Sequence, residues 1–282
     1  MMELLSTWFI EPLSFAFMQR ALVTSLLIGI VCSVFSCFLV LKGWSLMGDA
    51  VSHAVLPGIA LAFVAGIPMM LGAFAAGLLC AVGTGYLKAN SRVKEDAVMG
   101  IVFSGMFALG LVLLTQIETD VHLLHILFGN VLGISEREMW EAGIIATAAS
   151  AIMLAKRRDL MLYCFDPSHA SVIGLPVKWL HFGLLILLAL TIVASLQAAG
   201  IILVIAMLIA PGAIGFLTCR SFDRMLLVAV AVSVFSCIGG TLISYHLDVA
   251  TAPLIVVIQS AIFVLALLRG KSRNAAPAEK LI

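Results

Sequence analysis

The residues best suited to metal chemistry are an acid and a histidine four positions apart, Asp49 and His53. They lie in the stretch KGWSLMGDAVSHAVLPG at 42–58, and the chain then stays apolar through Ala65. Residues at positions i and i+4 lie one above the other on a helix, so the two side chains can present two ligands to one divalent cation. The alternative is an Asp–His hydrogen bond that serves only helix packing.

The chemistry of this ligand pair limits which ions it suits. A carboxylate and an imidazole without a thiolate suit Mn²⁺, Fe²⁺ or Zn²⁺. Two ligands per chain are too few for tight binding, but two chains facing each other across a pore would offer four. Because Zn²⁺ binds more tightly than Mn²⁺ at such sites, these two residues do not set the choice of metal.

Composition places this pair inside a membrane. Of 282 residues, 63% are hydrophobic and 11% are charged, which is typical of a polytopic membrane protein rather than a soluble domain. Spans of about 20 apolar residues, without the alternation of a β-barrel, predict an all-α transmembrane bundle. Nine candidate spans are found, at 21–41, 44–65, 68–87, 97–116, 140–155, 180–197, 200–218, 225–245 and 252–268. The fifth, sixth and ninth are short, so eight spans remain an alternative.

Basic residues set the expected orientation. Of the 16 Lys and Arg residues, all except Arg20 and Arg137 fall on one side of a nine-span arrangement. Since Lys and Arg gather in cytoplasmic loops, we expect the N-terminus outside and the C-terminus in the cytoplasm. The chain is then one transmembrane domain over residues 1–282, with an outer segment 1–19, a cytoplasmic loop 156–178 and a cytoplasmic tail 269–282. Its six cysteines form no CxxC and suggest neither disulfides nor a zinc knot.

The expected outer loops carry acidic and histidine side chains. Four of them are candidates for an outer mouth that attracts cations: Glu118, Asp120, His122 and His125. The alternative is that these acidic loops only reflect membrane topology.

The cytoplasmic loop after Arg158 contains a well-delimited short helix. We expect Asp166 as its N-cap, Pro167 in its first turn and Gly174 as its C-terminal stop, with His169 at the surface. Such a helix is suited to docking into another protein, although an ordinary interfacial helix is the alternative. A second irregularity is Pro211, in the middle of an apolar span, where proline removes a helix hydrogen bond. Broken helices of this kind often line transport paths, and they also often serve only packing.

Four stretches together resemble the permease subunits of bacterial metal-importing ATP-binding-cassette (ABC) transporters. They are residues 43–58, KEDAVMG at 94–100, the loop 166–174 and IAPG at 209–212. The pattern SLMGDAxSH is most similar to that of the manganese and chelated-iron permeases, and zinc permeases differ more around their Asp and His.

This resemblance implies a type II importer fold in the bacterial inner membrane. It implies separate cytoplasmic ATP-binding subunits, a second permease chain as homodimer or heterodimer, and an extracytoplasmic metal-binding protein, with no nucleic acid partner. By the same match, Asp49 and His53 correspond to ion-contacting positions. Residues 166–174, with Asp166, Pro167, His169 and Gly174, correspond to the helix that couples to the ATPase.

The sequence assigns ATP hydrolysis to another chain. The only partial match to a nucleotide-binding P-loop, GKS at 270–272, has Leu265 where the first glycine is required. We therefore expect a transport subunit that is not itself an enzyme and holds no permanent cofactor, importing Mn²⁺ or Fe²⁺. The alternatives are a zinc-importing permease and an ion-gradient-driven metal carrier. An intramembrane metal hydrolase is disfavoured, because no three-ligand set or catalytic Glu accompanies Asp49 and His53.

Overall fold

The computed structural model describes residues 11–117 and 131–274, and in these ranges nine helical segments are long and apolar enough to cross a membrane. They are α3 (Ala16–Lys42), α4 (Met47–Ala54) with α5 (Leu56–Ala65), α6 (Met69–Ala89), α7 (Glu95–Thr115), α9 (Glu136–Ala155), α12 (Val177–Ala199), α13 (Ile201–Thr218), α14 (Phe222–Leu247) and α15 (Thr251–Asn274). Four short elements complete the described chain: α2 (Glu11–Leu13), η2 (Val131–Gly133), α10 (Arg157–Phe165) and α11 (Pro167–Val172). The prediction of an all-α bundle with nine spans is confirmed.

The spans that looked short in the sequence are longer in the structure. Helix α9 begins four residues before the expected start, because Ser135 and Glu138 cap it reciprocally through a capping box. Helix α12 begins at Val177, and α15 continues to Asn274, past the end of its apolar run. A hydropathy count stops at polar residues, whereas a helix continues until its backbone is capped. Helix α3 likewise begins before its expected start at residue 21, at Ala16.

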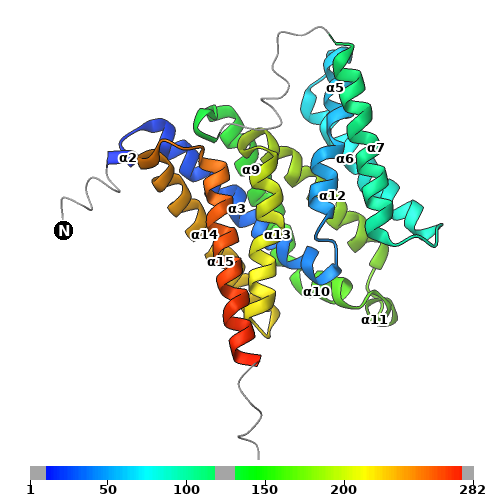
Figure 1. Ribbon diagram of the computed structural model, residues 1–282. Helices are drawn as coiled ribbons and strands as arrows, with labels where there is room; N and C mark the ends of the chain where they lie inside the picture. Colours follow the sequence, from blue (N-terminus) through cyan, green and yellow to red (C-terminus); the bar gives the residue numbers. More distant parts are fainter. Residues whose placement is uncertain (1–10, 118–130, 275–282) are drawn as a thin grey trace, which may run out of the picture.

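The longest span forms the centre of the first group of helices. Helix α3 packs against α9, α13 and α14, and α15 packs against α13 and α14. Large apolar side chains of α3, among them Phe35, Phe38 and Leu39, are fully buried in this core. In Figure 1 these helices form one side of the molecule, and α12 separates them from α5, α6 and α7.

The second group contains α4, α5, α6 and α7, and its backbones approach closely. A Cβ atom added to Gly58 on α5 would collide with the backbone carbonyl oxygen of Gly72 on α6, and the reverse is also true. Ala76 lies against the same position. Small residues therefore set the spacing of α5 and α6, as they do in many membrane bundles.

Pro211 does not break its helix. Of the two interpretations offered by the sequence, a broken helix that lines a transport path and a proline that serves packing, the structure has the second. Helix α13 continues from Ile201 to Thr218 with Pro211 buried inside it. The hydroxyl of Ser36 on α3 donates to the carbonyl of Ile209 at 3.1 Å and accepts from the N–H of Gly212 at 2.8 Å. These two bonds hold the backbone on either side of Pro211 against α3, so this site joins α3 to α13 by packing.

The two basic residues on the expected outer side are both paired with acids. Arg20 lies 3.7 Å from Glu136, and Arg137 lies 2.8 Å from Glu141. Each positive charge is therefore balanced by a nearby carboxylate. This pairing explains why Arg20 and Arg137 can lie on the side where the other basic residues are not expected. All six cysteines are free thiols, as the sequence predicted.

Candidate metal site and docking helix

The site begins at a tight connection between α3 and α4. Gly43 ends α3 in the left-handed conformation, with φ of 75°, which glycine adopts without steric cost. The N–H of Met47 then donates to the carbonyl of Trp44 at 2.9 Å and opens α4. Asp49 consequently lies in the first turn of α4, where the helix dipole favours a negative charge.

The structure brings the two predicted ligands together. Nε2 of His53 lies 3.2 Å from Oδ1 of Asp49, and the two side chains are 29% and 31% exposed, respectively. This is the i, i+4 geometry that the spacing predicted. Buried charges in a membrane are costly, so a carboxylate left partly open in an apolar segment is a candidate for function.

Helix α7 supplies the surroundings of His53. The imidazole lies 6.1 Å from the ring of Phe103, nearly parallel to it, and 5.2 Å from that of Phe107, edge to face. Among the described residues, Nδ1 of His53 is buried without a hydrogen-bond partner. The two aromatic rings limit the rotation of the imidazole on the side of α7. The contact with Asp49 uses Nε2 and leaves Nδ1 without a partner among the described residues.

A helix break lies directly after His53. The expected span 44–65 is two helices in series, α4 ending at Ala54 and α5 beginning at Leu56, with Pro57 in the first turn of α5. Proline cannot donate to the carbonyl of residue i−4, which here is His53, and its ring crowds that carbonyl. Of these two prolines in the described spans, Pro57, beside Asp49 and His53, lies at a helix interruption, and Pro211 does not.

The pair is incomplete as a metal site within one chain. Among the side chains that the structure describes, no group of three His, Cys, Asp or Glu residues could hold a metal ion. The predicted outer residues Glu118, Asp120, His122 and His125 lie in 118–130, outside the described residues. Their role in an outer mouth stays a prediction.

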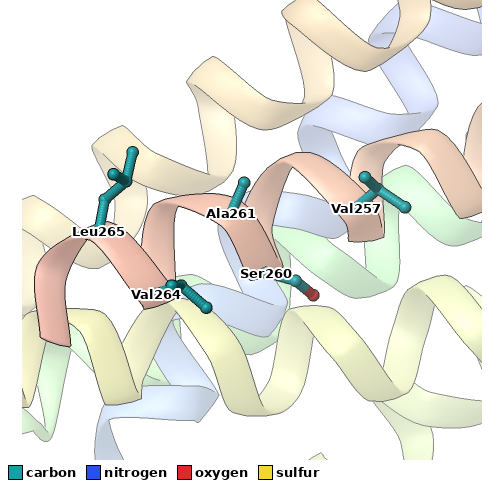
Figure 2. A pocket seen from close by; sticks show the side chains of 5 residues that line it. All are labelled: Val257, Ser260, Ala261, Val264 and Leu265. Atoms are coloured by element: carbon teal, nitrogen blue, oxygen red, sulfur yellow. The ribbon is translucent and has the colours of Figure 1, made fainter. Parts of the chain in front are cut away.

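A hollow on α15 lacks metal ligands. It has a volume of about 570 Å³ and is lined by Val257, Ser260, Ala261, Val264 and Leu265. Figure 2 shows these side chains along α15, with the Ser260 hydroxyl as the one polar group among them. An apolar, open hollow of this kind suits contact with other apolar surfaces and offers a cation no charged ligand.

The short helix α11 has the local structure that the sequence predicted. Oδ1 of Asp166 accepts the backbone N–H of His169 at 2.9 Å, and Pro167 opens α11. Gly174 follows the helix with φ of 86°, and His169 is exposed. Figure 1 shows α11 projecting at one end of the molecule, beyond α10 and α12.

Apolar side chains around α11 make it a candidate docking surface. Four of them are largely exposed: Phe165, Val172, Ile173 and Trp179. Phe165 and Trp179 were not among the residues predicted from the sequence, although large aromatic residues beside a charged loop were a usable signal. Exposed apolar groups beside a stiff helix are typical of a surface that another protein covers.

Comparison with known proteins identifies the class of this membrane bundle. The ABC 3 transport family model matches residues 14–270, which is nearly the whole chain. The chain belongs to the ABC 3 transport family, and it is a multi-pass permease of the ABC transporter class. The resemblance inferred from the sequence is confirmed.

Individual relatives agree with this assignment. The chelated iron transport system membrane protein YfeD of Yersinia pestis is 63% identical over 286 aligned residues, which cover 100% of this chain and 96% of the relative. The manganese transport system membrane protein MntB of Synechocystis is 53% identical, over 93% of this chain and 85% of the relative. A chain in the structure of PsaBC from Streptococcus pneumoniae in complex with Fab has a TM-score of 0.83 at 35% identity, covering 93% of this chain and 95% of that chain.

Proposed function

We propose that this chain is the membrane-spanning subunit of an ATP-driven importer that moves Mn²⁺ or Fe²⁺ into the cytoplasm, with Asp49 and His53 as transient ligands. The observation that carries the proposal is the Asp49–His53 pair, 3.2 Å apart and about one third exposed, at a break in an otherwise apolar span. A carboxylate and an imidazole suit these ions. The names of the relatives, which concern chelated iron and manganese, support the same metals.

The incomplete ligand set supports a second permease chain. Two ligands from each of two facing chains would give four, enough to hold a divalent ion and few enough to release it. An identical or a related second chain would supply the same number of ligands. The partly open faces of Asp49 and His53 are compatible with such a shared site.

ATP hydrolysis is assigned to separate cytoplasmic subunits that dock on α11. The exposed Val172 and Ile173, on a helix held at both ends by Asp166 and Gly174, support this assignment. A rigid projection transmits movement better than a flexible loop. An extracytoplasmic binding protein would deliver the ion, and the location would be the bacterial inner membrane.

The proposal is tested by reconstituting the chain with its ATP-binding subunits and binding protein in proteoliposomes. We expect ATP-dependent uptake of radiolabelled manganese or iron, and none with an ATP-binding subunit that binds but cannot hydrolyse ATP. Uptake that persists without ATP hydrolysis would favour the gradient-driven carrier. Uptake of radiolabelled zinc alone would move the chain to the zinc-importing alternative.

A further inference from the structure

A cluster of aromatic and basic side chains lies between the docking helix and the helix that carries Asp49 and His53. It contains Lys42 at the end of α3, Trp44 from the α3–α4 connection, Tyr163 from α10 and His181 from α12, of which Lys42 and His181 are half-buried. Tyr163 and Trp44 are only 2% and 5% exposed. None of these residues belongs to the proposed metal site.

The first link closes the base of the segment that bears α11. The hydroxyl of Tyr163 lies 2.7 Å from Nδ1 of His181, a hydrogen bond between residues 18 apart in the chain. Tyr163 precedes α11 and His181 follows it, so this bond ties together the two arms, α10 and α12, from which α11 projects. The two arms are therefore joined at the base of α11.

The second link connects those arms to α4. The indole of Trp44 packs edge-on against the imidazole of His181, with ring centroids 5.4 Å apart. Nζ of Lys42 lies 4.1 Å from the ring centroid of Tyr163, a distance at which a cation is attracted to an aromatic face. The carbonyl of Trp44 accepts the N–H of Met47, the first residue of α4. The contacts are thus continuous from α10 and α12, which flank α11, to the helix that presents Asp49.

We infer that the Tyr163–His181 hydrogen bond, together with Trp44, is the mechanical link that transmits movement of the docking helix to the Asp49–His53 helix. This inference rests on the proposed function. It makes Tyr163, His181 and Trp44 positioning residues, which touch neither the metal nor the ATPase. Coupling between distant sites requires a continuous physical network of packed and hydrogen-bonded groups, and this cluster is such a network.

The inference predicts that removing the hydrogen bond uncouples transport from ATP hydrolysis. The variants are Tyr163→Phe and His181→Phe, which keep a ring at each position, and the double variant. In proteoliposomes containing the complete transporter, manganese uptake and phosphate release are measured on the same preparation. We expect unchanged copurification of the ATP-binding subunits and continued ATP hydrolysis. The manganese moved per ATP should fall about two- to tenfold, the range for losing one hydrogen bond.

Matched variants separate this role from a merely structural one. Tyr86→Phe, on the exposed Tyr86 of α6, loses the same hydroxyl and should keep the wild-type ratio. The double variant should lose no more than either single variant, because both remove the same bond.

Two results would overturn the inference. One is a wild-type ratio of manganese to ATP in both single variants. The other is a loss of uptake that only follows a loss of assembled complex, which would assign the bond to folding. Wild-type complex that hydrolyses ATP but moves no manganese or iron would instead overturn the proposed function, and the inference with it.

Discussion

At the scale of single residues, burial separates side chains that can react from those that cannot. Asp49 and His53 keep about a third of their surface open, whereas five of the six cysteines are buried. Burial raises the pKa of the Cys164 thiol, in α10 outside the spans, to about 12, and the nearby Lys42 ammonium offsets this only partly. The reactive form of cysteine is the thiolate, so Cys164 is protected by both burial and protonation.

Thiol labelling tests this description of the core. Maleimide at about pH 8 should label one cysteine per folded chain, the partly exposed Cys219, because Cys164 remains a protonated thiol well above that pH. Mass spectrometry of the labelled protein in mild detergent is the measurement. Cys219→Ser should abolish labelling and Cys164→Ser should leave it unchanged. Rapid labelling of Cys164 would show that α10 is not packed as described.

At the scale of helices, the contact between α5 and α6 depends on two glycines. Since a Cβ on Gly72 would collide with the backbone of Gly58, Gly72→Ala should destabilise the bundle by about 1–3 kcal/mol, the usual cost of overpacking. Gly83→Ala is a matched control on the same helix, because a Cβ there meets nothing within 4 Å. Thermal unfolding followed by size-exclusion chromatography in detergent should show the loss for Gly72→Ala and none for Gly83→Ala. Equal unfolding temperatures would contradict the close approach of α5 and α6.

The docking helix gives a second prediction at this scale. Gly174 has φ of 86° and its N–H donates to the carbonyl of Ser171 at 3.1 Å, so Gly174→Pro should disrupt the end of α11. We expect loss of most copurification of the ATP-binding subunits from a permease that still folds. Charge reversal at the N-cap, Asp166→Lys, should act in the same direction.

Gly66 offers a control for that experiment. It also follows a helix with positive φ, 68°, and its N–H donates to the carbonyl of Phe63 at 3.2 Å, but it lies after α5 and not at α11. Gly66→Pro should therefore disturb its helix end and leave copurification intact. Undiminished copurification with Gly174→Pro would place the ATPase contact elsewhere, for instance in the basic loop 88–94.

The sequence predicted features that depend on local patterns. Nine spans follow from hydropathy, and the ends of α11 follow from the types of Asp166, Pro167 and Gly174. The i, i+4 geometry of Asp49 and His53 follows from helix periodicity. In each case the residues that determine the structure lie within a few positions of one another.

Features that depend on distant residues could not be predicted in this way. The backbone on either side of Pro211 is held by Ser36, on a helix far away in the sequence, so proline alone does not show whether a helix breaks. At Pro57, by contrast, one helix ends and the next begins. The Tyr163–His181 contact likewise depends on how α10 and α12 pack.

At the scale of the whole molecule, the ligand count predicts how many ions an assembled transporter holds. If two permease chains share one site, titration with Mn²⁺ should saturate at one ion for every two permease chains, with weak affinity. Electron paramagnetic resonance of free and bound Mn²⁺ measures this ratio in the detergent-solubilised complex. One ion per permease chain, retained in a single isolated chain, would contradict a shared site.

The central claim is that Asp49 and His53 carry the ion through the membrane, and ATP-dependent uptake of radiolabelled manganese tests it most directly. Asp49→Ala and His53→Ala should each reduce uptake to background while the complex assembles and hydrolyses ATP, since each removes one of the two ligands in the chain. Asp223→Asn, which removes a carboxylate from an exposed ion pair with Arg157, should transport normally. Near-normal uptake in either Asp49→Ala or His53→Ala would contradict the account.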